Sequence, residues 1–137
     1  MQMKDVPLIL VVDDESVNLT ILSWILDEAG FHVLTASSGP EARELATRRQ
    51  PDLILLDILM PGEDGYSVCR SLKQAPATQD TPVIFISGLS GDTEKASAMA
   101  LGAADFIMKP FSRQEILERV RLHLLPHQGD APDITGT

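Results

Sequence analysis

Five short apolar segments alternate with segments of helical periodicity along this chain of 137 residues. The first, Leu8–Val12, is a continuous aliphatic run, which is typical of a strand covered on both faces. Further strands are predicted at residues 31–36, 53–56, 83–86 and 106–108. Strands that alternate with helices form parallel sheets through right-handed crossovers, so the pattern predicts an α/β fold. Five such units suit a three-layer, doubly wound (βα)5 fold, with five parallel strands in the flavodoxin-like order 2-1-3-4-5.

Local signals mark the ends of some of these segments. Pro40 is expected as the first residue of the second helix, and Ser112 with Glu115 forms a capping box before the last one. The final residues contain Pro, Gly and Asp but no apolar period. We therefore expect one domain over residues 1–125 and a linker or disordered tail over residues 126–137.

Composition limits the classes of function. Acidic residues exceed basic ones by 20 to 11, giving a net charge of −9, which argues against nucleic-acid binding through a broad basic surface. The same charge suits a cation site, although a solvated acidic surface is the alternative. Cys69 is the only cysteine, which excludes an internal disulfide and indicates a reducing compartment. No apolar stretch approaches the roughly 18 residues needed to span a bilayer, so we expect a soluble, cytoplasmic chain with no membrane partner.

Polar residues follow four of the five predicted strands. In an open α/β sheet, ligands bind where the carboxyl ends of the strands meet, near the reversal of strand order. The first, third, fourth and fifth strands are neighbours in the order 2-1-3-4-5, and these four carry the polar residues. In chain order these residues are Asp13 with Asp14, Asp57, Ser87, and Lys109.

The chemistry of this set favours acceptance of a phosphoryl group. Three converging carboxylates repel one another unless a cation lies among them, and hard oxygen ligands favour Mg²⁺. Carboxylates form acyl phosphates as nucleophiles, while a lysine and a serine hydroxyl can contact phosphoryl oxygens. Phosphoryl transfer needs mainly positioning and charge neutralisation, which Mg²⁺ and Lys109 would supply together. No group for binding a nucleotide is evident.

Four sequence motifs resemble the response-regulator receiver family of two-component signal transduction. The resemblance covers roughly residues 7 to 125, and the motifs in this order are highly specific. They are Val11-Val12-Asp13-Asp14-Glu15, Leu55-Leu56-Asp57 with the following segment through Gly65, Ile86-Ser87-Gly88, and Leu101 through Phe111 with Asp105, Phe106, Lys109 and Pro110.

The resemblance implies a phosphoacceptor and a metal site. Asp57 would take the phosphoryl group and also bind Mg²⁺. Asp14 would bind Mg²⁺ directly and Asp13 mostly through water, with the backbone carbonyl of Leu59 as a further ligand. The phosphoryl donor would be a histidine kinase or a phosphotransfer protein. The domain would be a signalling phosphoacceptor that catalyses only its own phosphorylation and dephosphorylation.

The resemblance also implies a conformational switch. Ser87 and Lys109 would contact the phosphoryl group, and Phe106 would turn inward as Ser87 moves toward the phosphate. A buried strand aromatic is the alternative for Phe106. The Lys109–Pro110 peptide bond would be cis. The surface near the last strands and helices would change on phosphorylation, and a homodimer through the last helix–strand–helix face is an arrangement that the resemblance allows.

Two leucines depart from a generic family pattern. Leu59 and Leu89 occupy the variable positions that flank the phosphorylation site. Neither side chain can orient water by hydrogen bonding, which predicts slow hydrolysis of the Asp57 phosphate. The alternative is that both leucines only cover an apolar rim or a partner surface.

Other interpretations explain these residues one at a time. Asp13 and Asp14 could cap a helix, Asp57 could form a turn, and Lys109 could be solvated, but all would have to coincide. Two other functions are an aspartate-nucleophile phosphatase and a pseudo-receiver that only binds partners. The phosphatase pattern needs Asp-x-Asp after the first strand, where this chain has adjacent carboxylates. The remaining candidates, expected to be structural, are Trp24, Cys69, His32, His123 and His127.

Overall fold

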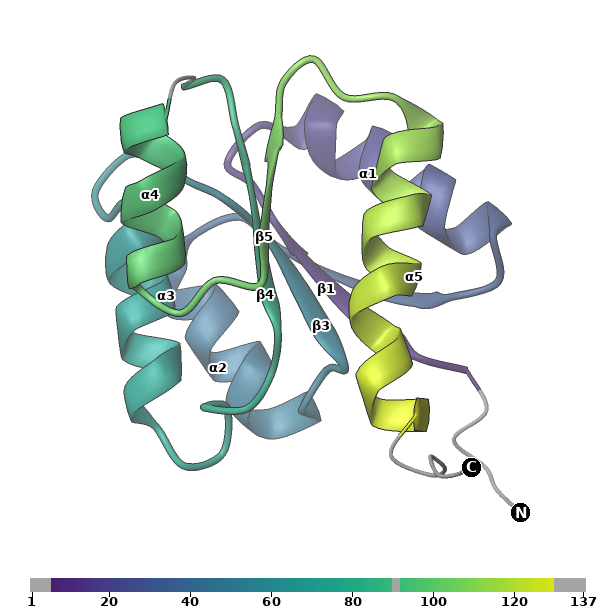
Figure 1. Cartoon of the computed structure of the whole chain (residues 1–137), viewed down its shortest axis with the longest axis horizontal. Coiled ribbons are helices and arrows are strands. Elements are labelled where there is room, and N and C mark those ends of the chain that lie inside the picture. The colour runs from purple at the N-terminus through teal and green to yellow at the C-terminus, as the bar shows by residue number, and fades with distance from the viewer. Residues whose placement is uncertain (1–5, 90–91, 130–137) are drawn as a thin grey trace.

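A computed structural model describes residues 6–89 and 92–129 of the chain. Within these residues, five strands alternate with five helices (Figure 1). The elements are β1 (Leu8–Val12), α1 (Ser16–Glu28), β2 (His32–Ala36), α2 (Gly39–Arg49), β3 (Leu53–Asp57), α3 (Gly65–Gln74), β4 (Val83–Ser87), α4 (Asp92–Ala100), β5 (Asp105–Met108) and α5 (Arg113–Gly129).

The strands form one parallel sheet in the order β2-β1-β3-β4-β5, which confirms the predicted topology. Val12 pairs with Leu56 between β1 and β3, and Asp57 pairs with Ile86 between β3 and β4. Asp13 follows Val12 as Asp57 follows Leu56, so the two carboxylates leave the sheet at the same level. Ser87 pairs with Met108, the residue before Lys109, and the same edge therefore carries all four sets of polar residues.

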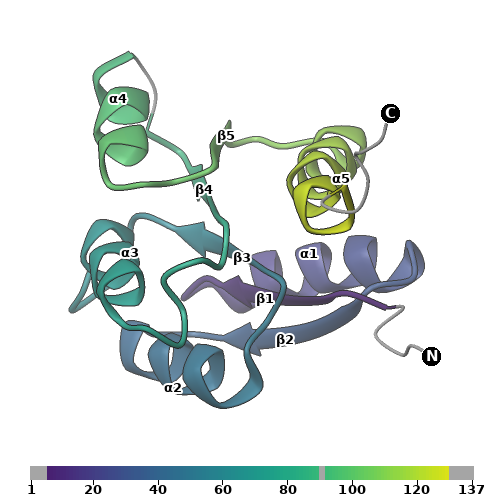
Figure 2. The same ribbon diagram turned by 60° about the horizontal axis from the view of Figure 1, so that its bottom comes forward.

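Helices cover both faces of the sheet. Helices α1 and α5 lie on one face and α2, α3 and α4 on the other (Figures 1 and 2). In β1, Ile9 and Val11 pack toward α1 and α5, while Leu10 and Val12 pack toward the opposite helices. Side chains alternate along a strand, so a strand covered on both faces is apolar throughout. This is why the strands were recognisable as continuous apolar runs.

The helix boundaries agree with the sequence signals in part. Helix α2 begins one residue before Pro40, and Ser112 Oγ accepts a hydrogen bond from the Glu115 N–H at 3.0 Å. Among the described residues, no return bond joins the Glu115 side chain to the Ser112 N–H, so half of the predicted capping box forms. Helix α5 continues to Gly129, so it includes the backbone of residues 126–129, the first part of the expected tail.

The rest of the expected tail, residues 130–137, lies outside the described residues, and the division into domain and tail stays a prediction. In the described part of the chain, every helix is too short or too polar to cross a membrane.

Candidate functional site

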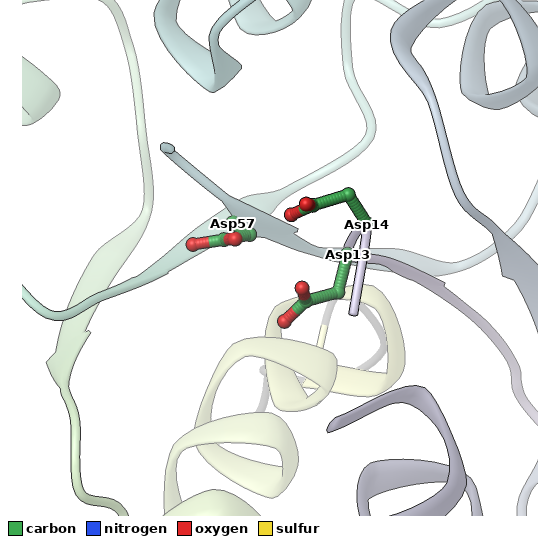
Figure 3. A group of neighbouring side chains, drawn as sticks. All are labelled: Asp13, Asp14 and Asp57. Carbon is green, nitrogen blue, oxygen red and sulfur yellow. The ribbon is translucent and has the colours of Figure 1, made fainter. Parts of the chain in front are cut away.

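Three carboxylates meet where β1 and β3 end. One oxygen from each of Asp13, Asp14 and Asp57 lies within 4.8 Å of the others. Figure 3 shows Asp13 and Asp14 leaving consecutive positions after β1, with Asp57 beside them on β3. Asp13 and Asp57 are buried, at 1% and 5% exposure, whereas Asp14 is exposed. The structure thus brings together the acidic residues that the sequence placed at this edge, and the cluster opens to solvent beside Asp14.

Lys109 reaches this cluster from β5, across the end of β4. Its Nζ lies 3.4 Å from Asp13 Oδ2 and 3.5 Å from Asp57 Oδ1. Its backbone N–H donates to the Ser87 carbonyl at 2.7 Å, which fixes where the side chain starts. The Lys109–Pro110 peptide bond is cis, as the family resemblance implied. Lys109 is therefore an ion-pair partner of the acidic cluster and not a solvated loop residue.

Asp13 is held from two sides. Its Oδ1 accepts the backbone N–H of Glu15 at 2.9 Å, while Oδ2 faces Lys109. Glu15 is the residue that caps α1, and its side chain makes no capping hydrogen bond. Neither Asp13 nor Asp14 is the capping residue, so the interpretation of the pair as a helix cap does not describe this structure.

The electrostatics of Asp57 show that the site lacks positive charge. Burial, and next the neighbouring Asp13 carboxylate, raise the pKa of Asp57 to about 6. Lys109 and a hydrogen bond from the Leu59 backbone lower the pKa of Asp57, but they do not compensate. Repulsion between like charges and loss of hydration both disfavour the ionised form, and a bound cation would relieve the repulsion.

The donor set fits a hard divalent cation. Three carboxylates can each offer an oxygen, and the exposure of Asp14 leaves room for water molecules on the ion. Mg²⁺ prefers oxygen ligands and retains several waters, which matches a site of this kind. The residues that could hold it are Asp13, Asp14 and Asp57, with the Leu59 carbonyl as a candidate on the loop that follows.

Gly65 gives the loop after Asp57 its shape. The Gly65 N–H donates to the Ile58 carbonyl at 2.7 Å, which closes the loop just before α3. A Cβ atom at Gly65 would overlap the Asp57 carbonyl oxygen, so a side chain cannot be placed there without moving the backbone. The close approach of α3 to the end of β3 therefore requires glycine at this position.

Comparison with known proteins identifies the chain. The model of the response regulator receiver domain family matches residues 9–121. The chain belongs to the response regulator receiver family. Members of this family act as signalling phosphoacceptors and interact with histidine kinases or phosphotransfer proteins, and receiver domains generally bind Mg²⁺ at an acidic pocket.

Similar receiver domains occur in different kinds of protein. It is 43% identical over 113 residues to the response regulator PleD of Caulobacter vibrioides, covering 82% of this chain and 25% of PleD. The chain thus spans about a quarter of the length of this relative. The receiver domain of a histidine kinase from Syntrophus aciditrophicus superposes with a TM-score of 0.81 at 34% identity, covering 96% of this chain and 98% of that one. The BeF3-activated receiver domain of Klebsiella pneumoniae RstA gives 0.79 at 32% identity, covering 85% and 97%.

Ser87 at the end of β4 and Phe106 on β5 are both buried in this receiver. The Ser87 side chain is fully buried, and its Oγ accepts the Leu89 N–H at 2.9 Å. Within residues 6–89 and 92–129, no hydrogen bond joins its hydroxyl to Asp57 or Lys109. Phe106 is 7% exposed and lies in the apolar cluster beneath α2, α3 and α4. The expectation of a buried strand aromatic is confirmed, while its switching function stays a prediction.

Two ties between elements of the receiver were missed by sequence reasoning. Tyr66 Oη donates to Glu94 Oε1 at 2.6 Å and joins α3 to α4. Burial, then the hydrogen bond to Glu94, raise the pKa of Tyr66 to about 12, which keeps its hydroxyl a donor. The second tie joins Glu63 to Arg43. These partners are 28 and 20 positions apart, so no local pattern in the sequence indicates either pair.

Of the residues expected to be structural, those whose side chains are described make no hydrogen bond to Asp13, Asp14 or Asp57. Trp24 is exposed on α1, and Cys69 is buried in α3, where burial raises the pKa of its thiol. His123 Nε2 lies 2.8 Å from Asp105 Oδ2, and His32 is exposed on the edge strand β2. The side chain of His127 lies outside the described part of the structure.

Proposed function

We propose that Asp57 is the phosphoacceptor of this receiver and that it takes the phosphoryl group of a phosphohistidine in a Mg²⁺-dependent reaction. The observation that carries the proposal is the position of Asp57, buried between Asp13 and Lys109 with its pKa raised to about 6. A carboxylate in this setting lies beside a lysine that can contact a phosphoryl group and beside two carboxylates that can hold a cation. The donor would be a histidine kinase or a phosphotransfer protein.

The metal would be held by the carboxylates of Asp13, Asp14 and Asp57 and by the Leu59 carbonyl. When bound, Mg²⁺ supplies positive charge against the developing negative charge of the phosphoryl oxygens. Asp13 is already oriented by the Glu15 N–H, so its other oxygen, Oδ2, faces Lys109 and the site. The exposed Asp14 leaves this side open to solvent and to the donor.

The transfer itself makes one bond and breaks one. A carboxylate oxygen of Asp57 attacks phosphorus while the P–N bond of the donor histidine breaks, and the imidazole leaves and takes up a proton. Lys109 Nζ, now 3.5 Å from Asp57, can move onto a phosphoryl oxygen and neutralise part of its charge. Among residues 6–89 and 92–129 the Ser87 hydroxyl has no acceptor, and its oxygen accepts the Leu89 N–H, so its proton could be donated to another phosphoryl oxygen.

The signal would be a change of the surface near β4, α4, β5 and α5. Ser87 would move toward the phosphoryl group, and the Phe106 ring would follow, so that two conformations change their populations. Dimerisation through the face of α4, β5 and α5, a cytoplasmic location and the absence of direct nucleic-acid binding stay predictions. The domain would catalyse only its own phosphorylation and dephosphorylation.

Intact-mass analysis after incubation with acetyl phosphate tests the proposal. We expect one phosphoryl adduct on the parent, formed only with Mg²⁺ and lost in Asp57→Ala. Asp80→Ala is the matched control, since Asp80 is an exposed carboxylate in the loop before β4. An adduct that persists in Asp57→Ala would refute the assignment. A folded parent without any adduct would favour the pseudo-receiver, and turnover of a chromogenic phosphate ester would favour the phosphatase.

A further inference from the structure

The carboxylate of Glu63 is held by three hydrogen bonds on the loop between β3 and α3. Arg43 Nη1, on α2, donates to Glu63 Oε1 at 2.8 Å and to Oε2 at 2.7 Å. Ser67 Oγ, in the first turn of α3, donates to Oε2 at 2.9 Å. The hydrogen bonds from Arg43, and next from Ser67, lower the pKa of Glu63, so the group is ionised at neutral pH. Glu63 thus joins its loop to a helix on the same face of the sheet.

Helix α2 is shaped to receive this carboxylate. A Cβ atom at Gly39, the first residue of α2, would overlap Glu63 Oε1, and the Val68 side chain would be 3.0 Å away. The missing side chain therefore makes the space in which the carboxylate lies. The start of a helix also favours a negative charge. Gly39, Arg43 and Ser67 surround one acidic side chain, which is more than an incidental surface ion pair provides.

The loop that Glu63 holds carries Leu59, next to the phosphoacceptor. The Leu59 backbone is close enough to the Asp57 carboxylate to lower the pKa of Asp57, and Leu59 is 55% exposed. The base of the loop is closed by the hydrogen bond from Gly65 to Ile58. Among the described residues, the bonds from Arg43 are the side-chain hydrogen bonds that join residues 58–64 to an element other than α3. Together with Met60, which packs against the hydrophobic core, these bonds hold the outer part of the loop.

We propose that Arg43 and Glu63 are positioning residues for the phosphoryl and metal site. Their ion pair fixes the β3–α3 loop so that the Leu59 amide stays on the Asp57 carboxylate and the Leu59 carbonyl stays in place as a metal ligand. Neither residue touches the reacting atoms. The inference rests on the proposed function, because it assigns to Leu59 a part in Mg²⁺ binding.

An effect of net charge and an effect of loop positioning would change Mg²⁺ affinity in opposite directions in Arg43→Gln. Arg43→Gln makes the chain more negative, so an effect of charge alone would leave Mg²⁺ binding unchanged or tighten it. Loss of positioning weakens Mg²⁺ binding instead. Partners of metal ligands typically change metal affinity by about 10- to 100-fold, and a partly exposed pair should give less, roughly three- to tenfold. The sign of the Arg43→Gln effect therefore separates the two explanations.

Isothermal titration with Mg²⁺ on the parent, Arg43→Gln, Glu63→Gln and the double variant measures this effect. Arg48→Gln is the matched control, because it removes the same charge from α2 where the ion pair with Glu44 is on the surface. We expect weaker Mg²⁺ binding in both single variants, no further loss in the double variant, and parent-like binding in Arg48→Gln. Arg43→Lys keeps the charge but lacks the planar guanidinium whose Nη1 donates to both Glu63 oxygens, and should fall between the parent and Arg43→Gln.

Two further measurements keep the outcomes distinct. Thermal unfolding without Mg²⁺ shows which variants are folded, and Arg43→Lys remains a usable test if Arg43→Gln is not. The initial rate of phosphorylation by acetyl phosphate, at limiting Mg²⁺, should fall in parallel with affinity. A folded Arg43→Gln that binds Mg²⁺ as tightly as Arg48→Gln would overturn the inference while leaving Asp57 as phosphoacceptor. Absence of phosphorylation in the parent would instead count against the proposed function.

Discussion

Gly65 lies so close to the carbonyl oxygen of Asp57 that no side chain fits between them. This contact sets how near the start of α3 comes to the end of β3, and so it fixes the direction in which the chain leaves the phosphoacceptor. A residue with no catalytic group of its own thereby limits the geometry of the site.

Substitution of Gly65 by alanine should be costly. The new Cβ atom would overlap backbone, which cannot rotate away, and such overpacking typically costs about 1–3 kcal/mol of folding free energy. Chemical denaturation of Gly65→Ala and Gly88→Ala measures the difference, since a Cβ at Gly88 has no atom within 4 Å. Equal unfolding free energies for the two variants would show that the close contact is not limiting.

Asp57→Asn should stabilise the protein in the absence of Mg²⁺ at neutral pH. The pKa of Asp57 is raised to about 6 from an ordinary 3.8, so the folded state binds the proton more tightly than the unfolded state does. Ionised Asp57 therefore disfavours folding above pH 6, and asparagine removes a cost of about 3 kcal/mol.

The pH dependence of unfolding tests whether Asp57→Asn is stabilising for this reason. The stability gain of Asp57→Asn should be complete above pH 6, shrink as the pH falls through that value, and vanish below the unfolded pKa near 4. Urea unfolding with a chelator at pH 7.5 and at pH 4.5 measures it. Parent and variant of equal stability at pH 7.5 would contradict the raised pKa.

Lys109→Met should separate metal binding from phosphoryl transfer. The variant loses a cation that competes with the metal for Asp13 and Asp57, so Mg²⁺ affinity should be kept or increased. The rate of adduct formation should fall at least about tenfold, because a positive group that neutralises the transferring phosphoryl oxygens is gone. Mg²⁺ titration and phosphorylation rates on one preparation give both quantities. A loss of Mg²⁺ binding in the variant would instead indicate that Lys109 holds the carboxylates in place.

Leu59→Asn should shorten the lifetime of the phosphorylated form. Leu59 is exposed beside Asp57 and cannot hydrogen-bond water, whereas an amide could orient a water molecule toward the acyl phosphate. We expect hydrolysis to accelerate severalfold, followed as loss of the phosphoryl adduct by mass. Leu59→Met is the control of similar size and polarity to leucine. If asparagine and methionine gave the same lifetime, Leu59 would only cover an apolar rim.

The sheet and the cluster of carboxylates could be predicted from the sequence for a physical reason. A strand buried on both faces is apolar throughout, so Asp57 stands out where β3 ends, and strand order then decides which ends are neighbours. The same reasoning placed Lys109 with Asp13 across 96 positions of sequence.

Contacts between helices and loops could not be predicted from the sequence. Arg43 meets Glu63 only because α2 and the loop before α3 have one particular relative placement, which no spacing rule specifies. The missing half of the capping box has a local origin instead, because Glu115 lies one helical turn from Arg119, with Oε2 3.9 Å from Nη2. Local sequence patterns therefore indicate which side chains can form such contacts, but the folded structure decides which partner each one has.

Lys109 crosses the end of β4 to reach carboxylates on two other strands. We therefore expect a change in charge at Asp57 to act on the end of β5 directly, through this one side chain. The distance in sequence between the reacting carboxylate and β5 is large, but the path of contact between them is one residue long. A change of charge on the central strand β3 would in this way reach the edge strand β5.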